Sequence, residues 1–200
     1  MKKILALALA LIMLSVFVGC NAPRVEISRG TIDGSVYKNE VLDFEFTKPS
    51  SWVYYTDEEI ADAMNFAVDN LLDDKFQNAL ENNSVLYDMM VVDSITRTNI
   101  SVGYENLRKT SWTNMTEKQY IEALKNQLSN VSSMNVTFTD EIETVKLGNT
   151  EFTKCVCTNR VSGVSMTQVY YLRNIGGYMA MVIVTISSGY TVAKIEGMFK

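Results

Sequence analysis

The stretch Gln168–Ile186, QVYYLRNIGGYMAMVIVTI, decides the fold of this chain. It contains two runs rich in Tyr, Val and Ile, and the Gly176-Gly177 pair between them suits the positive φ angles of a tight hairpin turn. A strand that is apolar on both faces must be covered on both faces. We therefore predict that the second run is an inner strand of a sheet with helices packed over it. Its two faces carry Tyr178, Ala180, Val182, Val184 and Ile186 on one side and Met179, Met181 and Ile183 on the other.

The rest of the chain supplies further strands and helices for one domain. Helices are predicted after two capping boxes, at Thr56–Glu59 and Thr116–Gln119, and at the closing segment Gly189–Lys200. The first of them carries an apolar stripe from Ile60 to Leu80. We predict an α+β fold, with an antiparallel sheet of about six to seven strands covered by helices on both faces, as an α/β/α sandwich. The other strand patterns lie in 42–47, 85–92, 98–104, 136–138, 144–147 and 151–158.

The composition excludes several classes of function. The chain has no histidine, which removes Ser-His-Asp and Cys-His catalytic arrangements and the most common metal ligand. Its three cysteines are too few for an all-cysteine zinc site. The net charge is −5 and no run of Lys or Arg is longer than two, so we expect no nucleic-acid partner. No cofactor and no metal site is predicted.

Residues 1–19 are typical of an export signal, because Lys2 and Lys3 precede a short apolar run that ends at small residues. The sequence Phe17-Val18-Gly19-Cys20 resembles the lipobox of bacterial lipoproteins, although Phe17 replaces the usual Leu or Val. In that family the cysteine receives a diacylglycerol and becomes the new N-terminus. We therefore predict lipid attachment at Cys20 and a location at the extracytoplasmic face of the cell membrane. The alternative is a plain secretory signal that is cut after Ala22.

The residues that follow Cys20 are expected to connect the anchor to the domain. Residues 20–35 are predicted to be a polar tether with Gly30 and Gly34, which as a flexible coil would span roughly 20 Å. The single folded domain is then expected over residues 36–200.

The segment Val36–Trp52, VYKNEVLDFEFTKPSSW, combines a strand pattern with a series of aromatic residues. Its order Tyr-x-Asn-Glu followed by Phe-x-Phe-x-x-Pro-x-x-Trp resembles the entry motif of exported domains with the PsbP-like fold. The photosystem II extrinsic protein and a Ran-binding import factor share that fold. The resemblance covers about Val36 to Lys200. It implies that the aromatic residues build the core and that the protein works by docking to larger assemblies.

Four residues are candidates for a binding surface. Tyr54 and Tyr55 follow the aromatic series, while Arg108 and Trp112 lie in the polar connection Glu105–Asn114. Aromatic and Arg side chains dominate the binding energy of many interfaces, which is the reason for choosing them. In the alternative interpretation, Trp112 packs beneath the helix that follows it.

Asp88 is the most unusual acid, because it lies in the apolar strand Val85–Val92. An unpaired carboxylate there would cost several kcal/mol. We expect it to pair with a structural arginine such as Arg97, Arg108 or Arg173. Asp73 and Asp74, on adjacent helical positions about 100° apart, are interpreted as a solvated face and not as a metal site.

Cys155 and Cys157 lie two positions apart on a predicted strand and so share one face. Their separation of roughly 6–7 Å is too large for a disulfide without distortion. We therefore interpret them as buried structural thiols. The alternative is an oxidised loop, which would form if the strand ended early and Cys157 turned back, since an exported compartment permits disulfides.

Together these patterns favour a non-enzymatic binding or interaction module, held at the membrane by a lipid anchor, whose partner is an unknown protein or small ligand. One alternative is a carboxylate-dependent hydrolase of the cell envelope, which needs two acids about 5–10 Å apart across a cleft. Another is an accessory factor for a membrane complex that acts through an exposed sheet edge. The candidate acids for a hydrolase are Asp43, Glu45, Asp88 and Asp93.

Overall fold

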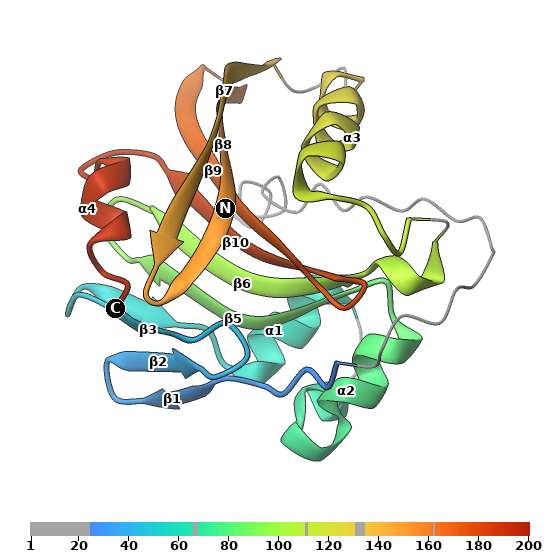
Figure 1. The fold of residues 1–200 in the computed structure, drawn as a ribbon. Coiled ribbons are helices and arrows are strands. Elements are labelled where there is room, and N and C mark those ends of the chain that lie inside the picture. Colours follow the sequence, from blue (N-terminus) through green and yellow to red (C-terminus); the bar gives the residue numbers. More distant parts are fainter. Residues whose placement is uncertain (1–24, 66–67, 111, 131–134, 162) are drawn as a thin grey trace.

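The computed structural model describes residues 25–200 apart from 66–67, 111, 131–134 and 162. This part of the chain forms two antiparallel sheets with short helices around them (Figure 1). The small sheet contains β1 (Thr31–Asp33), β2 (Val36–Asn39) and β3 (Phe44–Thr47), in that order. The large sheet contains β4 (Trp52–Tyr54), β5 (Val85–Asp93), β6 (Asn99–Asn106), β7 (Asn135–Leu147), β8 (Thr150–Val161), β9 (Val164–Ile175) and β10 (Tyr178–Ile186).

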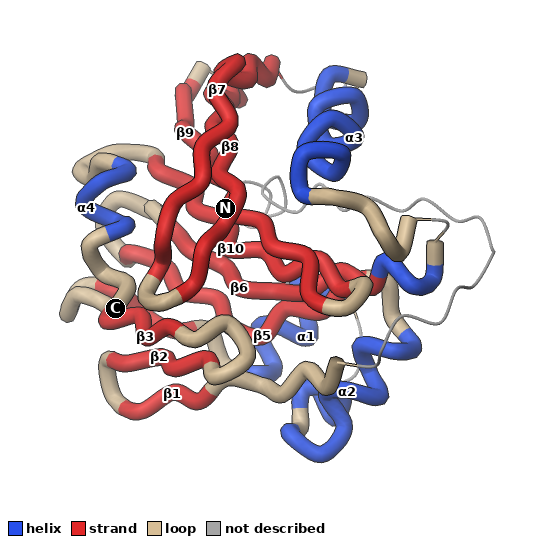
Figure 2. The backbone as a smooth tube through the Cα atoms, viewed as in Figure 1, coloured by secondary structure: helices blue, strands red, loops and turns tan. Residues whose placement is uncertain are grey.

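The seven strands of the large sheet follow the order β4-β5-β6-β10-β9-β8-β7. The α+β class and the antiparallel sheet of about seven strands are therefore confirmed. The helices are short and lie outside the strands (Figure 2). They are α1 (Asp57–Met64), α2 (Asp73–Asn82), α3 (Glu117–Ser129) and α4 (Val192–Glu196), with 3-10 turns η2 (Val68–Leu71) and η3 (Leu107–Lys109).

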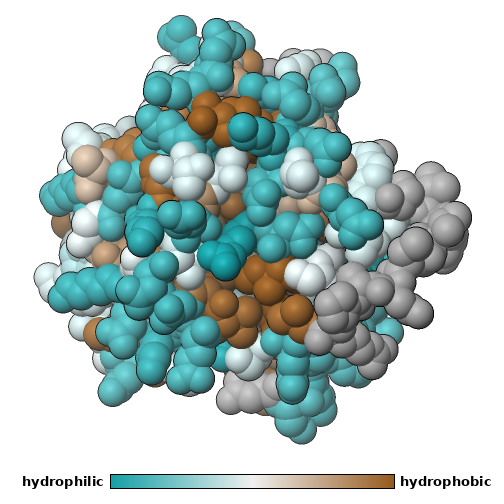
Figure 3. Space-filling model, in the orientation of Figure 1, coloured by the Kyte–Doolittle hydropathy of each residue, from teal (hydrophilic) through white to brown (hydrophobic). Residues whose placement is uncertain are grey.

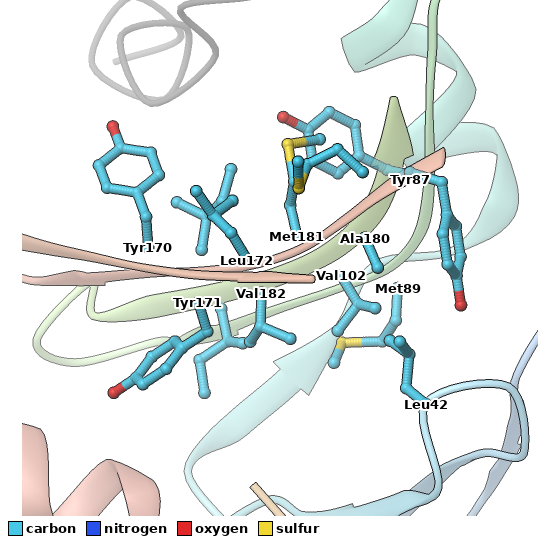
Figure 4. Packing of buried hydrophobic residues seen from close by; sticks show 14 of the residues in the cluster. Leu42, Tyr87, Met89, Val102, Tyr170, Tyr171, Leu172, Ala180, Met181 and Val182 are labelled. Carbon is cyan, nitrogen blue, oxygen red and sulfur yellow. The ribbon is translucent and has the colours of Figure 1, made fainter. Parts of the chain in front are cut away.

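β10 is the central strand, as the sequence predicts. It pairs with β6 on one side and β9 on the other, and Val182 lies opposite both Val102 and Tyr171. Every residue of the strand is buried. The β9–β10 turn has φ angles of 56° at Gly176 and 88° at Gly177, which confirms the predicted hairpin. Figure 4 shows Tyr170, Leu172 and Met181 on one side of the sheet and Tyr171, Val182 and Val102 on the other.

The small sheet and its loops pack against one face of the large sheet. Leu42 points toward Met89 and Val102 (Figure 4), and the ring centroids of Phe44 and Phe152 are 6.3 Å apart. α2 contacts this same face. On the opposite face lies α3, where the Tyr120 hydroxyl donates a hydrogen bond to the Glu105 carboxylate of β6. The two apolar faces of the central strand are thus covered by different kinds of structure.

Residues 25–35 belong to the fold, although the sequence suggested a flexible tether over residues 20–35. Ile27 is completely buried, and its backbone N–H donates to Gln77 Oε1 of α2 at 2.7 Å. β1 also pairs with β2, with Ile32 opposite Tyr37. The folded domain therefore includes Val25 and does not begin at Val36. Residues 20–24 lie outside the described residues.

The apolar stripe from Ile60 to Leu80 is divided between two helices. α1 ends at Asn65, whose φ of 57° is left-handed, a conformation that asparagine tolerates well. Leu72, in an extended conformation, precedes α2 and has 45% of its surface exposed. The change of direction lets α1 contact β5 while α2 reaches β6.

The predicted closing helix Gly189–Lys200 is also shorter than expected. α4 ends at Glu196, and the chain then runs beside β3, where the backbone groups of Glu45 and Lys200 exchange two hydrogen bonds of 2.8 Å. The Phe199 ring lies 5.2 Å from that of Phe44 and 5.1 Å from that of Phe46. This aromatic contact favours the extended conformation, so the chain end closes the edge of the small sheet.

Replacement of Phe199 by Ala is expected to lower the free energy of unfolding by about 3–5 kcal/mol, because it empties a buried aromatic site. The matched control is Ile95→Ala, since Ile95 is 79% exposed and such surface changes usually alter stability by less than about 0.5 kcal/mol. Urea unfolding measures both. Equal midpoints for the two variants would show that the C-terminal contact is not part of the stable fold.

Candidate functional site

The four predicted surface residues lie at two ends of the large sheet. Tyr54 is opposite Val91 on β5, whereas Arg108 follows Glu105, which is opposite Val85 on the same strand. Six strand positions separate Val91 from Val85, which corresponds to roughly 20 Å. The structure therefore brings Tyr54 together with Tyr55, and Arg108 with Trp112, but does not join the two pairs.

Arg108 supports the β9–β10 turn. Its Nε donates to the Gly176 carbonyl at 2.8 Å, and its guanidinium lies 5.2 Å from the ring centroid of Tyr178. Trp112 remains partly exposed, so it is not enclosed beneath α3. Its backbone carbonyl accepts a hydrogen bond from the Met115 amide at 2.8 Å. η3 also approaches the C-terminal end of α2, because Lys109 Nζ donates to the Asn82 carbonyl. We call α2, η3 and Trp112 the α2 end.

Tyr54 and Tyr55 lie at the end of the sheet where two apolar residues of β4 and the β5–β6 turn are exposed. Val53 of β4 is 56% exposed and Ile95, in the β5–β6 turn, is 79% exposed. The two segments are joined by a hydrogen bond from the Ser94 amide to the Ser51 carbonyl at 3.2 Å. We call Val53, Tyr54, Tyr55 and Ile95 the β4 end. Sequence reasoning missed Val53 and Ile95, because isolated apolar residues in a strand and a turn carry no signal of exposure.

The Tyr54 hydroxyl is held by the small sheet, since it donates to the Ser35 carbonyl at 3.1 Å. Burial raises the pKa of Tyr54 to about 12. Tyr55 is also half-buried, and its amide donates to the Met90 carbonyl at 2.9 Å. Both side chains therefore stay neutral at physiological pH and offer partly fixed aromatic surface. On the face drawn in Figure 3, apolar atoms form separate groups among mostly hydrophilic residues.

Asp88 is the centre of a buried polar cluster at an irregular position of β5. Its Oδ2 accepts hydrogen bonds from the Gly30 amide at 2.9 Å, the Tyr37 hydroxyl at 2.5 Å and Asn39 Nδ2 at 3.0 Å. Its Oδ1 lies 3.4 Å from Arg29 Nε. Burial raises the pKa of Asp88, while these hydrogen bonds and the arginine lower it. Asp88 thereby connects β5 to the N-terminal segment and to the small sheet.

An arginine does pair with Asp88, but it is Arg29, and not Arg97, Arg108 or Arg173. Arg29 also forms two hydrogen bonds with Asp57 of α1, at 2.8 and 2.5 Å, and donates to the Leu71 carbonyl at 2.6 Å. The hydrogen bond from Arg29 lowers the pKa of Asp57. Arg29 therefore fastens the N-terminal segment to α1, η2 and β5 at once.

Replacement of Arg29 by Leu is expected to reduce the free energy of unfolding by about 3–5 kcal/mol, because it leaves the buried Asp88 without its cation. The matched control is Lys38→Leu. Lys38 pairs with Glu40 at 3.5 Å on the surface, where both side chains are at least half exposed, and such pairs contribute about 1 kcal/mol or less. Urea unfolding of both variants tests the difference. If Arg29→Leu lost as little stability as Lys38→Leu, the contacts of Arg29 with Asp57 and Asp88 would not stabilise the fold.

Glu105 is the second buried acid, and it lies on the face that carries α3. It accepts a hydrogen bond from Tyr120, whose hydroxyl is also 3.4 Å from Met181 Sδ. Burial raises the pKa of Glu105 to about 7, although the Tyr120 hydrogen bond lowers it. Asp88 and Glu105 project from opposite faces of the sheet. They therefore cannot act together across one cleft.

The raised pKa of Glu105 makes stability depend on pH. Between its unfolded value of 4.5 and about 7, the folded protein binds more protons than the unfolded chain, so stability falls as pH rises. Glu105→Gln is expected to remove this part of the pH dependence. At pH 8 the variant should be more stable than the native chain by up to about 3 kcal/mol. Urea unfolding at pH 5 and pH 8 tests this, and parallel losses in both proteins would contradict it.

The remaining candidate acids have structural positions. Asp93 accepts hydrogen bonds from the Ile95 amide at 3.1 Å and from Thr96 Oγ1 at 2.8 Å, which shapes the β5–β6 turn. Asp43 sits at a left-handed φ of 46° before β3, and Glu45 pairs with the chain end. Among the residues that the structure describes, no group of three or more Cys, Asp or Glu could hold a metal ion.

Cys155 and Cys157 are buried and unbonded in β8, which confirms the interpretation from their spacing. Burial raises the pKa of the Cys155 thiol to about 11 and that of the Cys157 thiol to about 12. Both thiols therefore stay protonated and weakly reactive.

Cys20, the predicted lipid attachment site, precedes the described residues. None of the helices within the described ranges has the length and apolar character that crossing a membrane requires.

Comparison with known proteins does not assign this chain to a family. No protein-family model matches the chain, and no curated protein matches it. Among solved structures it is similar to a protein from Bacteroides thetaiotaomicron VPI-5482 with a crystal structure at 1.50 Å resolution, at a TM-score of 0.42 and 13% sequence identity. The matched part covers 79% of this chain and 44% of that protein, so this chain spans less than half its length.

Proposed function

We propose that the protein is an extracytoplasmic lipoprotein, anchored at the membrane through Cys20, whose folded domain is a non-enzymatic binding module. The observation that carries the anchor is the leader, in which a charged start and a short apolar run end at Gly19-Cys20. More than one acyl chain on that cysteine would hold the protein stably, since a single chain binds a bilayer only marginally.

The binding surface that we propose is the β4 end. Val53 and Ile95 are 56% and 79% exposed there, and Val53 projects from the face of β4 opposite to the half-buried Tyr54 because side chains alternate along a strand. Exposed apolar side chains grouped with fixed aromatic residues are typical of sites that bind proteins. We therefore favour an extracytoplasmic protein partner over a small ligand.

Several contacts support a role without catalysis. The buried acids Asp88 and Glu105 are on opposite faces of the sheet, and each is held by a tyrosine hydroxyl. The chain also has no histidine to serve as a general base. These observations weigh against the alternative of a cell-envelope hydrolase that uses two carboxylates.

The PsbP-like fold is part of the same proposal, although a small sheet, where an α/β/α sandwich would have helices, packs on one face of the large sheet. It is supported by the burial of Tyr37, Phe44, Phe46 and Trp52, the aromatic residues of the motif. Docking to larger assemblies is the mode of action that the resemblance implies.

An accessory factor that works through a sheet edge is the second candidate, because β7 is a long edge strand with many exposed residues. Its pairing with β8 is interrupted between Phe138 and Ile142, where Asp140 and Glu141 are exposed. Interruptions and charges of this kind discourage the addition of another strand. We therefore place the partner at the β4 end.

Mass spectrometry of the mature protein tests the anchor. We expect an N-terminal cysteine, Cys20, that carries a diacylglyceryl group. A mature chain that begins after Ala22 without lipid would contradict the proposal.

Crosslinking in intact cells tests the binding surface. Val53→Asp combined with Ile95→Asp is expected to abolish the crosslinked species, because charge at the β4 end opposes an apolar contact. The control is Val164→Asp, since Val164 is as exposed as Val53, at 56%, but lies at the start of β9. Equal crosslinking in both variants would exclude the β4 end.

A further inference from the structure

We infer that the α2 end of the domain faces the lipid bilayer, with Trp112 and Lys109 at the level of the headgroups, so that the β4 end points away from the membrane. The inference rests on the proposed anchor at Cys20. It is independent of the proposed partner, because it follows from the length of the connection and from the place where that connection joins the domain.

The connection from the anchor to the fold is short. Only five chain steps separate Cys20 from Val25, which span at most about 18 Å even when fully extended. The domain of about 176 residues has a radius of gyration of roughly 16 Å and hence a diameter of about 40 Å. A connection of less than half that diameter cannot pass around the domain to its far side. The side that carries Val25 must therefore remain near the bilayer.

That side is the α2 end. The described chain begins beside α2 (Figure 1), where the Ile27 amide donates to Gln77 at 2.7 Å. The C-terminal end of α2 is joined to the neighbouring segments, since Asn106 Nδ2 donates to the Leu80 carbonyl at 3.0 Å and Lys109 Nζ bonds to Asn82. These hydrogen bonds fix η3 and the segment after it in one unit with the point of entry.

The side chains at the α2 end suit the headgroup region. Trp112 is partly exposed, and an indole ring prefers the boundary between apolar and aqueous phases. Lys109 is exposed and can reach lipid phosphates. In the α2 end the three bases Lys75, Arg108 and Lys109 equal in number the three acids Asp73, Asp74 and Glu81. The anchor, and not surface charge, therefore sets the orientation, so anionic lipid should have little effect.

The β4 end is too far away to touch the same bilayer. β5 runs from Val85, close to α2, to Asp93, beside the turn that holds Ile95. Eight strand steps correspond to roughly 27 Å. The exposed apolar residues Val53 and Ile95 are therefore directed toward partners outside the membrane.

The two tryptophans of the chain allow a direct test, because they lie at opposite ends. Trp52 is 1% exposed and pairs with Asp93 at the β4 end, whereas Trp112 belongs to the α2 end. Full-length protein, purified from a host that processes lipoproteins, is placed in phosphatidylcholine vesicles whose acyl chains are brominated near the headgroup. We expect these lipids to quench part of the emission. In Trp112→Phe the quenchable part should disappear while the emission of Trp52 persists.

Energy transfer to a headgroup-labelled lipid gives a second readout. Maleimide donors are attached at Asn82→Cys and, as the matched control, at Ile95→Cys, both of which are exposed positions. Transfer should be several-fold stronger from residue 82 than from residue 95, with or without phosphatidylglycerol. Equal transfer would overturn the orientation.

The outcomes separate the two proposals. Protein that floats with the vesicles, but whose tryptophan emission is unchanged by brominated lipid, contradicts the orientation and leaves the anchor intact. Full-length protein that carries no acyl group and does not float with vesicles contradicts the anchor, and the orientation falls with it.

Discussion

The fold depends on one constraint, which is that β10 is apolar on both faces and must be shielded from water on both. Its two neighbours, β6 and β9, complete its backbone hydrogen bonds, so only the faces remain to be covered. The small sheet packs on one face, where the rings of Phe44 and Phe152 are 6.3 Å apart, and Tyr120 of α3 reaches Glu105 and Met181 on the other. The large sheet supplies a buried acid on each face, and the covering structure supplies its tyrosine partner: Tyr37 of β2 bonds to Asp88, and Tyr120 of α3 bonds to Glu105.

The central strand, its hairpin and the antiparallel α+β class could be predicted from sequence, because period-two apolar patterns and a Gly-Gly turn are local signals. Three features were beyond local reasoning. Arg29 lies 59 residues before Asp88, in a segment whose polarity suggests a tether, yet long-range packing of Ile27 incorporates that segment. The aromatic contacts of Phe199 override a helical stripe. Asn65 ends α1 within an otherwise periodic pattern. In each case a tertiary contact or a single backbone angle outweighs local propensity.

For the candidate surface, too, the sequence predicts the types of residue but not their arrangement. Aromatic and Arg residues could be chosen from sequence by type, but their positions depend on strand pairing, which separates Tyr54 and Tyr55 from Arg108 and Trp112. With the anchor proposed at Cys20, this separation would place the two pairs in different surroundings. In our proposal, Arg108 and Trp112 belong to the end that faces the lipid, and Tyr54 and Tyr55 belong to the end that binds a partner.

The bridge between Phe46 and Phe199 also fixes the order of events when the protein is made. β3 cannot complete its hydrogen bonds until residues 198–200 are in place, because its neighbour Phe199 lies far along the sequence from Phe46. Contacts between residues so far apart in the sequence form late in folding.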